Sequence, residues 1–344
     1  MKALVYTQPR KVEYLDWPDP QLAAGDALVR VGAVSLCGSD VHGWLGHSRG
    51  RVPPLVLGHE MAGVVERVDR GEAVEPGQLV AVYPIIGCNR CSYCSSDQEY
   101  ICRRKRVLGL HEAGGCAQFL KAPARNLYPL VNGMGTLLGS LVEPLSNALH
   151  FVSLAEHDRG PCAVLGAGPI GLLILQIARS LAFQPIAIIE VNARRSELAR
   201  RLGADMALNP QEPGAAERLE SFFGEDGCSV VFDAAGFSST RQLALKLARS
   251  GGLIVLAGLG VAETNFDCIE LIRREVRVTG AYAYSRRQFQ QAIEWIAGGR
   301  ASFDGWVSEA NLRDGQSILE ELAQTKPERI KVVLRPDQGL TIVD

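Results

Sequence analysis

The sequence has no basic tract, no long hydrophobic run and few aromatic side chains, which make up 6% of its 344 residues. Acidic and basic residues are intermixed and give a net charge of −2, so nothing favours binding to nucleic acid or to an anionic membrane. The most apolar stretch, residues 163–178, is interrupted by glycine, proline and glutamine, and it is shorter than the roughly 20 apolar residues of a membrane span. The first residues also lack a signal-peptide pattern. We therefore expect a cytoplasmic protein with no membrane or nucleic-acid partner.

Cysteine is the informative residue type, because nine are present and an odd number without a signal sequence favours reduced thiols and metal ligation over disulfides. Four of them form the pattern Cys-x2-Cys-x2-Cys-x7-Cys in a polar segment, which core packing does not explain. Four thiolates complete a tetrahedron around zinc and leave no position for a substrate, so we predict a structural zinc site. A redox disulfide pair or a chance cluster would be the alternative, and a zinc ribbon that binds nucleic acid would need more basic and aromatic neighbours. The predicted ligands are Cys88, Cys91, Cys94 and Cys102.

A second set of possible metal ligands would leave one coordination position of the metal free. Cys37 is followed by His59 and Glu60, and Glu143 stands far downstream. One thiolate, one imidazole and one carboxylate leave a fourth zinc position for water or an alcohol. Taken singly, Cys37 could be a buried thiol and His59 a core histidine. Their occurrence together, in a chain with an independent zinc lobe, favours a catalytic zinc site.

Zinc in such a site would act as a Lewis acid that binds the alcohol oxygen, lowers its pKa and stabilises the alkoxide from which hydride departs. The released proton must then reach solvent. Ser39 and His42 lie in the segment 37–42 and are spaced to relay it, from the hydroxyl to the imidazole. For His42 the alternative is a surface histidine after a turn.

Residues 163–171 carry a dinucleotide fingerprint, Gly-x-Gly-x-x-Gly, after an apolar strand and before a helix. The glycines allow a tight turn and a close approach of the backbone to a pyrophosphate, and the helix N-terminus supplies donors and a partial positive charge. We predict that the cofactor contacts Gly166, Gly168, Pro169, Ile170 and Gly171.

Glu190 ends the next predicted strand, nineteen residues beyond Gly171. A carboxylate there accepts hydrogen bonds from the adenosine ribose and repels a 2′-phosphate, so we expect NAD rather than NADP. Arg194 and Arg195 leave NADP open, because a guanidinium could bind that phosphate. Arg195 could instead stack on the adenine or be an exposed residue in the first turn of a helix.

Three stretches follow one another along the chain. Up to about residue 147, short β-branched runs are broken by glycine and proline, which is typical of a β-rich domain. Residues 148–281 alternate apolar strands with helices, which predicts an α/β domain with a doubly wound parallel sheet. Residues 282–344 contain a helix near 289–297 and a strand near 330–334. They are too few to fold alone and are expected to return to the first domain.

These motifs together resemble those of the zinc-containing medium-chain dehydrogenase/reductase (alcohol dehydrogenase) family, and the match covers essentially the whole chain. The residues that carry it are the four-cysteine lobe, the glycine fingerprint and the segments 37–42, 58–60 and 143–145. Within the family, the run through Val41-His42 is similar to the polyol, sorbitol dehydrogenase-like branch. The segment Glu143-Pro144 is also similar to that branch, because simple alcohol dehydrogenases usually carry a zinc-binding cysteine at this position.

The resemblance implies a GroES-like catalytic domain formed by residues 1–147 and 282–344, with its structural zinc lobe at about residues 86–104. It implies a Rossmann domain at residues 148–281 that binds NAD, and it implies a homodimer or homotetramer. In the family, either the glutamate after the zinc histidine or the later one can be a zinc ligand. Glu60 and Glu143 are therefore both candidates for the third protein ligand.

Two departures from the polyol pattern concern the substrate. Ala283 stands where sorbitol dehydrogenases typically carry an arginine that binds substrate hydroxyls, and Gly43 stands where a tyrosine or another side chain is common. Losing both removes polar contacts that would select the substrate. Further candidates for substrate contacts are Arg286 and Arg287, which could hold an acid or a phosphate group or begin a solvated helix, and Trp44, His47 and Arg49.

We therefore predict an enzyme with two zinc ions per chain that transfers a hydride between NAD and a secondary alcohol. The expected small-molecule substrate is a polyol, a sugar alcohol or its phosphate. One alternative is another secondary alcohol, such as a threonine-like amino alcohol or an aliphatic diol. A non-catalytic nicotinamide-binding protein is disfavoured, because Cys37, Ser39 and His59 are all present.

Overall fold

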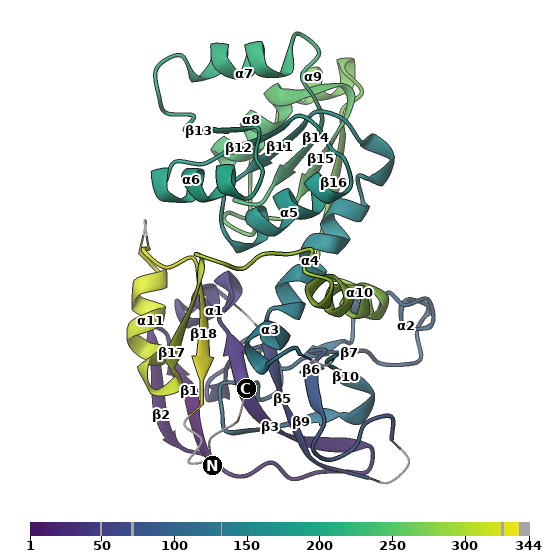
Figure 1. The fold of residues 1–344 in the computed structure, drawn as a ribbon, viewed down its shortest axis with the longest axis vertical. Coiled ribbons are helices and arrows are strands. Elements are labelled where there is room, and N and C mark those ends of the chain that lie inside the picture. The colour runs from purple at the N-terminus through teal and green to yellow at the C-terminus, as the bar shows by residue number, and fades with distance from the viewer. Residues whose placement is uncertain (49, 70–71, 132, 325–326, 337–344) are drawn as a thin grey trace. The chain divides into compact units, whose positions relative to one another are not determined.

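The computed structural model describes residues 1–344 except 49, 70–71, 132, 325–326 and 337–344. The chain divides into two compact units, drawn as ribbons in Figure 1. The first contains Met1–Pro144, Ser285–Gly299 and Phe303–Asp344, and the second contains Leu145–Tyr284 and Arg300–Ser302. The first unit is therefore built from both ends of the chain.

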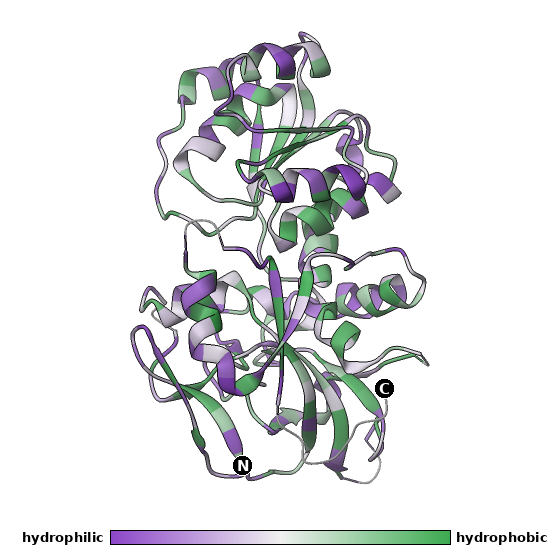
Figure 2. Ribbon diagram, turned by 60° about the vertical axis from the view of Figure 1, so that its left-hand side comes forward, coloured by the Kyte–Doolittle hydropathy of each residue, from purple (hydrophilic) through white to green (hydrophobic). Residues whose placement is uncertain are grey.

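The first unit is organised around a seven-stranded sheet with the strand order β10-β6-β5-β3-β18-β17, in which β9 also pairs with β3. Its strands are rich in β-branched residues, and Figure 2 shows the hydrophobic colour concentrated along them. The strands are β3 (Asp26–Ser35), β5 (Glu60–Val68), β6 (Leu79–Val82), β9 (Phe119–Pro123), β10 (Leu127–Pro129), β17 (Val307–Asn311) and β18 (Lys331–Arg335).

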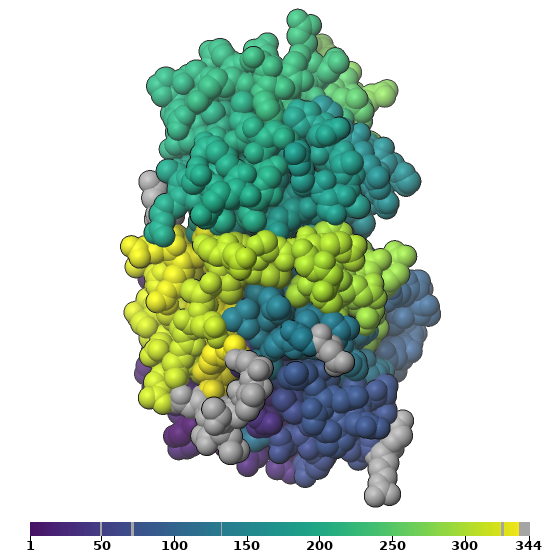
Figure 3. Space-filling view, in the orientation of Figure 1, coloured from purple at the N-terminus to yellow at the C-terminus, as the bar shows by residue number. Residues whose placement is uncertain are grey.

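Strand β18 joins the late part of the chain to the early part. It runs antiparallel to β3, with Val333 opposite Ser35 and Leu334 opposite Val34, and it runs parallel to β17. Side chains of β3, β5 and β18 share one hydrophobic core. In Figure 3 the yellow atoms of the last segment accordingly adjoin the blue and purple atoms of the first third of the chain.

Smaller elements complete this unit. One three-stranded sheet has the order β2-β1-β4, and β7 pairs with β8. Helix α10 begins with a capping box, in which the Ser285 hydroxyl accepts the backbone N–H of Gln288 while the Gln288 side chain accepts that of Ser285. The remaining elements are β1 (Lys2–Gln8), β2 (Lys11–Asp16), α1 (Gly38–Trp44), β4 (Leu55–Val56), β7 (Ile85–Ile86), α2 (Ser92–Ser95), η1 (Glu99–Ile101), β8 (Arg106–Val107), η2 (Ala124–Asn126), α3 (Thr136–Ser140), α10 (Arg286–Ala297), η4 (Leu312–Asp314) and α11 (Gly315–Leu322).

The second unit holds a six-stranded parallel sheet with the order β13-β12-β11-β14-β15-β16. The strand order reverses direction between β11 and β14, and this is the arrangement of a Rossmann sheet, in which ligands bind at the reversal point. Strands β11, β12 and β14 are buried along their whole length, as expected for a sheet covered on both faces.

The strands of this unit are β11 (Cys162–Leu165), β12 (Ile186–Ile189), β13 (Met206–Leu208), β14 (Cys228–Asp233), β15 (Ala248–Leu256) and β16 (Arg277–Gly280). Its helices are α4 (Val142–Ser153), whose first turn belongs to the other unit, η3 (Glu156–Asp158), α5 (Pro169–Ser180), α6 (Ala193–Arg201), α7 (Ala215–Phe223), α8 (Ser238–Leu247) and α9 (Cys268–Arg273). Across the described residues of both units, no helix has the length and apolar character needed to cross a membrane. The fold is thus the one expected from the sequence: a Rossmann parallel sheet and a β-rich GroES-like part made from both chain ends.

Candidate functional site

Three predicted zinc ligands lie at two neighbouring strand ends in the β-rich unit. Cys37 follows β3 and is the N-cap of α1, while His59 directly precedes β5, whose first residue is Glu60. Because β3 and β5 are antiparallel, the end of one lies beside the start of the other, and the register sets Ser35 opposite Glu60. The ligand atoms of Cys37, His59 and Glu60 lie within 4.8 Å of one another. A sulfur, a nitrogen and an oxygen at this separation fit a zinc ion with one open position.

The buried carboxylate of Asp40 holds two of these residues together. Its Oδ2 accepts the backbone N–H of Cys37 at 3.0 Å, and its Oδ1 lies 3.3 Å from Nδ1 of His59. Burial would raise the pKa of Asp40, but His59 and Arg51 outweigh burial and hold it well below its ordinary value. For His59, burial would lower the pKa, but the Asp40 carboxylate outweighs it and raises the pKa well above its ordinary value. With Nδ1 directed at Asp40, Nε2 is the ring atom available to a metal.

Glu60 is paired with a buried lysine that the sequence analysis did not single out. The Lys331 ammonium group forms an ion pair with Oε2 of Glu60 and donates to the Leu36 carbonyl at 2.9 Å. The Ser35 hydroxyl donates to the same carboxylate oxygen. Burial opposes the charge on Lys331, but Glu60, followed by Cys37, outweighs that cost and raises the pKa of the ammonium group. The signal in the sequence is a lysine directly before the apolar run Val332–Leu334.

Glu143 lies apart from the three clustered ligand residues. It is buried in the first turn of α4. Its ligand oxygen is not part of the group formed by Cys37, His59 and Glu60 in the described residues. The Glu143 carboxylate is nevertheless close enough to contribute to the raised pKa of Lys331. It therefore belongs to the charged surroundings of the site.

The two residues of the expected proton relay both lie on α1. The Ser39 hydroxyl is 3.5 Å from Nε2 of His59, which places it at the edge of the ligand cluster. His42 is partly exposed, and its ring centroid lies 5.9 Å from that of His47. Burial, together with the positive charges of His47 and Arg51, lowers the pKa of His42. A lowered pKa keeps the His42 imidazole neutral, which is the form that accepts a proton.

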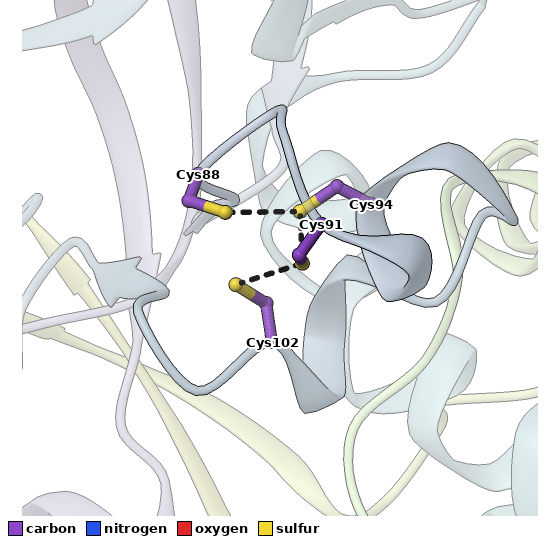
Figure 4. Close-up of side chains that lie close together, drawn as sticks. All are labelled: Cys88, Cys91, Cys94 and Cys102. Atoms are coloured by element: carbon purple, nitrogen blue, oxygen red, sulfur yellow. Dashed lines mark hydrogen bonds between the residues drawn. The ribbon is translucent and has the colours of Figure 1, made fainter.

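The four-cysteine cluster forms a compact group of sulfur atoms that point toward one another (Figure 4). The Sγ–Sγ distances are 3.6 Å for Cys91–Cys94, 3.6 Å for Cys91–Cys102 and 4.0 Å for Cys88–Cys94. A zinc tetrahedron with Zn–S bonds of about 2.3 Å requires sulfur atoms about 3.8 Å apart, so the cluster has the dimensions of a zinc site. All nine cysteines are free thiols.

The thiol pKa values in the cluster also indicate a cation site. A hydrogen bond from the Arg90 backbone lowers the pKa of Cys88 to about 6, whereas burial raises the pKa of Cys94 to about 11. The Cys94 thiol therefore resists ionisation at neutral pH, and a cation beside it would offset that resistance. A bound metal deprotonates its thiol ligands outright and removes that penalty.

Arg286 fastens this lobe to the body of its unit. Its Nε lies 2.5 Å from Oε1 of Glu99, a residue between the third and fourth cysteines, and its guanidinium donates to Asn126 Oδ1 at 2.7 Å. It also stacks 4.6 Å above the ring of Tyr83. The sequence suggested that Arg286 could hold an acid or phosphate group of a substrate, but the structure commits the guanidinium to these internal partners. The exposed Arg287 lies beside it, with its backbone N–H directed at Asp97 at 3.4 Å.

The other substrate candidates have different surroundings. Trp44 is buried in the core and directs its Nε1 at Gln316. His47 is exposed. Ala283 has a φ of 52°, a left-handed conformation that costs an alanine energy and leaves little side chain to contact a ligand. Arg49 lies outside the described residues.

The glycine fingerprint forms the turn between β11 and α5, at the point where the strand order reverses. Gly166 has a φ of 96°, and a Cβ on Gly171 would lie 1.9 Å from the Gly166 carbonyl oxygen, so both positions require glycine. Gly168 is the N-cap of α5, with Pro169 at its first turn, and a Cβ on Gly168 would meet nothing within 4 Å. Open space beside a helix N-terminus, whose first N–H groups have no partner within the helix, fits a pyrophosphate. Ile170 lies in the same turn and is half-buried.

Glu190 lies beside this turn. Its carboxylate accepts the backbone N–H of Ala167 at 2.7 Å and that of Asn192 at 2.8 Å. The Asn192 side chain in turn caps α6 by accepting the N–H groups of Arg194 and Arg195. Among the described residues, the buried Nε atom of Arg195 has no hydrogen-bond partner. Glu190 thus lies against the glycine turn, and Arg195 lies in the first turn of α6.

A parallel sheet with a glycine turn, accompanied by a Cys/His/Glu cluster and a four-thiol cluster, defines a metal- and dinucleotide-dependent oxidoreductase. Two family models match this chain: the alcohol dehydrogenase GroES-like domain at residues 23–132 and the zinc-binding dehydrogenase at residues 169–298. D-xylulose reductase A from Aspergillus oryzae is 32% identical over 330 residues, covering 92% of each chain. L-galactonate-5-dehydrogenase from Escherichia coli K12 is 30% identical over 306 residues, covering 88% of this chain and 89% of the relative.

A solved structure agrees with these relatives. The chain is 27% identical to a zinc-binding dehydrogenase from Sinorhizobium meliloti 1021 that was crystallised with NADP, with a TM-score of 0.88 over 97% of this chain and 99% of the other. The chain belongs to the zinc-type alcohol dehydrogenase family. It is a zinc-dependent oxidoreductase that uses a nicotinamide cofactor.

Proposed function

We propose that this enzyme transfers a hydride between a nicotinamide cofactor and a secondary alcohol that is a polyol, a sugar alcohol or a sugar-alcohol phosphate. The observation that carries the proposal is the cluster of Cys37, His59 and Glu60, which lie within 4.8 Å of one another in the same unit as a separate four-thiol cluster. The names of the two relatives, a xylulose reductase and a galactonate dehydrogenase, support an open-chain, polyhydroxylated substrate.

Cys37 and His59 are the proposed fixed ligands of a catalytic zinc, with Glu60 or Glu143 as the third. Zinc supplies a Lewis acid that binds the alcohol oxygen and lowers the pKa of its hydroxyl group. The proximity of Glu60 to both fixed ligands favours it as the third. Its ion pair with Lys331 favours Glu143 instead, because a carboxylate bound to an ammonium group is a weaker donor to a metal. Both glutamates therefore remain in the proposal.

Ser39 and His42 form the proposed path by which the alcohol proton leaves. The Ser39 hydroxyl lies 3.5 Å from His59 Nε2, next to the position that an alcohol oxygen would take. It can accept the proton from the alcohol while it donates its own toward the imidazole of His42. His42 is partly exposed and holds a neutral ring, so it can receive the proton and pass it to water.

We propose NAD as the cofactor in preference to NADP. The nicotinamide ring of the bound cofactor accepts the hydride. The Glu190 carboxylate lies against the glycine turn through its bond to Ala167 N–H, where it can bind ribose hydroxyls and repel a 2′-phosphate. Against this stand the unpartnered Nε of Arg195 and the NADP in the Sinorhizobium structure. A comparison of kcat/KM for the two cofactors decides between them.

Cys88, Cys91, Cys94 and Cys102 are the proposed ligands of a second, structural zinc, which gives two zinc ions per chain. Free thiols at every cysteine position suit a reducing compartment, and we propose the cytoplasm. The proposed catalytic domain comprises residues 1–147 and 282–344, and the proposed cofactor domain comprises residues 148–281.

A homodimer or homotetramer is also part of the proposal. Strand β16 is the edge of its sheet. The exposed side chain of Val278 lies on this strand, exposed Tyr282 follows it, and exposed Ile269 and Ile272 lie on the preceding α9. An open strand edge beside exposed apolar side chains is suited to pairing with a second copy. The mass of the native protein in solution tests this, and a Val278→Lys variant that stays oligomeric would count against this face.

The substrate proposal is tested by NADH formation from NAD with matched sets of polyols, sugar-alcohol phosphates, sugar acids and simple secondary alcohols. Turnover of polyols or their phosphates, with little turnover of simple alcohols, is the expected result. Turnover of simple alcohols alone would contradict the polyol assignment. It would show that the small residues Gly43 and Ala283 mark a change of substrate.

A further inference from the structure

We propose that Arg51 is a positioning residue for the open metal site, and that it sets the affinity of this site for its metal by fixing Asp40. This inference rests on the proposed function, in which Cys37 and His59 are metal ligands. It assigns to Arg51 no contact with the alcohol or the cofactor.

The contacts of Arg51 all point inward. Its side chain is 4% exposed, and one terminal nitrogen donates to Asp40 Oδ1 at 2.8 Å. The same nitrogen lies 3.4 Å from the Ser39 hydroxyl, and Nε donates to the Gly109 carbonyl at 3.2 Å. A guanidinium held on two sides in this way has a fixed orientation, because its donors are coplanar.

Asp40 transmits that orientation to both fixed ligands. One carboxylate oxygen binds the Cys37 backbone, and the other faces both Arg51 and His59 Nδ1. Loss of a group that orients a metal ligand typically lowers metal affinity by about 10- to 100-fold. Arg51 therefore acts on both Cys37 and His59 through a single intervening residue, Asp40.

Gly43 provides the room for Arg51. A Cβ at position 43 would lie 2.2 Å from Cδ and 2.9 Å from Nε of Arg51, so any larger residue would displace the guanidinium. The missing side chain at position 43, which the sequence analysis related to the substrate, thus has a second explanation. Gly43 is therefore needed for Arg51 to occupy its position beside Asp40.

The side chains packed around the site also give Arg51 a charge to balance. Three buried acidic residues, Asp40, Glu60 and Glu143, are accompanied by two buried basic residues, Arg51 and Lys331. Lys331 pairs with Glu60, and Arg51 pairs with Asp40. Without Arg51 the carboxylate of Asp40 would face His59 with no permanent cation beside it.

The test measures metal affinity rather than turnover. Purified holoenzyme is titrated with a chromogenic chelator, and the release of the open-site zinc is compared with release from the four-cysteine lobe, which serves as an internal reference. We expect Arg51→Met to weaken the open site by about 10- to 100-fold and to leave the lobe unchanged. In a Co²⁺-substituted protein, the visible absorption bands should shift, because the ligand geometry changes. Arg51→Lys keeps the positive charge but not the planar guanidinium group, so its open-site zinc affinity should lie between those of the wild type and Arg51→Met.

A matched control is Arg30→Met, which removes an arginine of β3 that pairs with Glu66 at 3.1 Å on the surface. It should leave both zinc affinities unchanged. Unchanged open-site affinity in Arg51→Met, with a raised KM for the alcohol or the cofactor, would overturn the proposal and make Arg51 a binding residue. A wild-type open site that takes up neither Zn²⁺ nor Co²⁺ would contradict the proposed function itself.

A double-variant cycle protects the test against a variant that folds poorly. Asp40→Asn should weaken the open site in the same way, and combining it with Arg51→Lys should add little, because both act through one contact. Effects of Arg51→Lys and Asp40→Asn that multiply independently would overturn the proposal.

Discussion

Lys331 and Glu60 form an ion pair inside the β-rich unit, although they are 271 residues apart in the chain. Their side chains are 2% and 1% exposed. The pair lies where the starts of β5 and β18 flank the end of β3, next to Cys37 and His59. Lys331 therefore governs the negative charge that Glu60 can offer to a metal.

Replacing Lys331 with methionine should destabilise the protein strongly. The substitution leaves Glu60 as a buried carboxylate without its cation, and breaking a buried pair typically costs about 3–5 kcal/mol. Denaturant unfolding of the zinc-loaded protein measures the loss. The control is Lys2→Met, which removes an exposed lysine paired with Asp16 and should cost no more than about 1 kcal/mol. Equal losses in the two variants would show that the buried pair contributes no more than a surface pair.

Cys37→Ala should abolish turnover and leave cofactor binding nearly intact. The thiolate is a proposed metal ligand in the β-rich unit, whereas the glycine turn belongs to the Rossmann unit. Turnover with the best alcohol and NADH binding by fluorescence are measured on the same preparation. Cys268→Ala removes an exposed thiol elsewhere and should change neither quantity. A Cys37→Ala enzyme that still oxidises alcohol would disprove the role of Cys37.

Metal analysis of the native protein should give two zinc ions per chain. Cys91→Ser should remove the lobe zinc and retain the other, because the two clusters share no ligand. Amide hydrogen exchange should then accelerate in residues 88–102, while the sheet formed by β3 and β5 stays protected. A wild-type protein with one zinc or none would contradict the division into a closed and an open site.

The pH dependence of turnover should reflect the lowered pKa of His42. The neutral ring is the proton acceptor, so the acid limb of kcat should lie below the ordinary histidine value of 6.5, and His42→Gln should remove that limb. His47→Gln removes a nearby positive charge and should shift the limb to higher pH. Because the folded pKa is below the unfolded one, His42 should also cost stability as the pH falls below 6.5. An acid limb that is unchanged in both variants would exclude His42 from the relay.

Periodic features of the sequence predicted much of the fold. The strand before the glycine turn and the helix after it were expected, and they appear as β11 and α5. The late strand expected near 330–334 appears as β18 and returns to the first part of the chain. Such features are local, because one short segment contains both the hydrophobic pattern and the turn residues.

The partners of the ligands could not be predicted in the same way. The role of Lys331 depends on Glu60, 271 residues away, and no local pattern connects a lysine in β18 with a carboxylate in β5. Arg51 is only 11 residues from Asp40, but it follows the helix in an irregular segment, where no periodicity indicates which side chains meet. The partner of Arg286 is likewise far away in the sequence, since Glu99 lies in the cysteine lobe. Two signals were present: a lysine directly before the apolar run Val332–Leu334, and a glycine at position 43 with no turn to require it.

The insertion of β18 beside β3 also limits when the site can form during synthesis. A ribosome delivers Cys37, His59 and Glu60 early, but Lys331 emerges 271 residues after the carboxylate that it neutralises. Until β18 has joined the sheet, the Glu60 carboxylate lacks its buried cation. The surroundings of Cys37 and His59 are therefore completed by one of the last segments of the chain to be made.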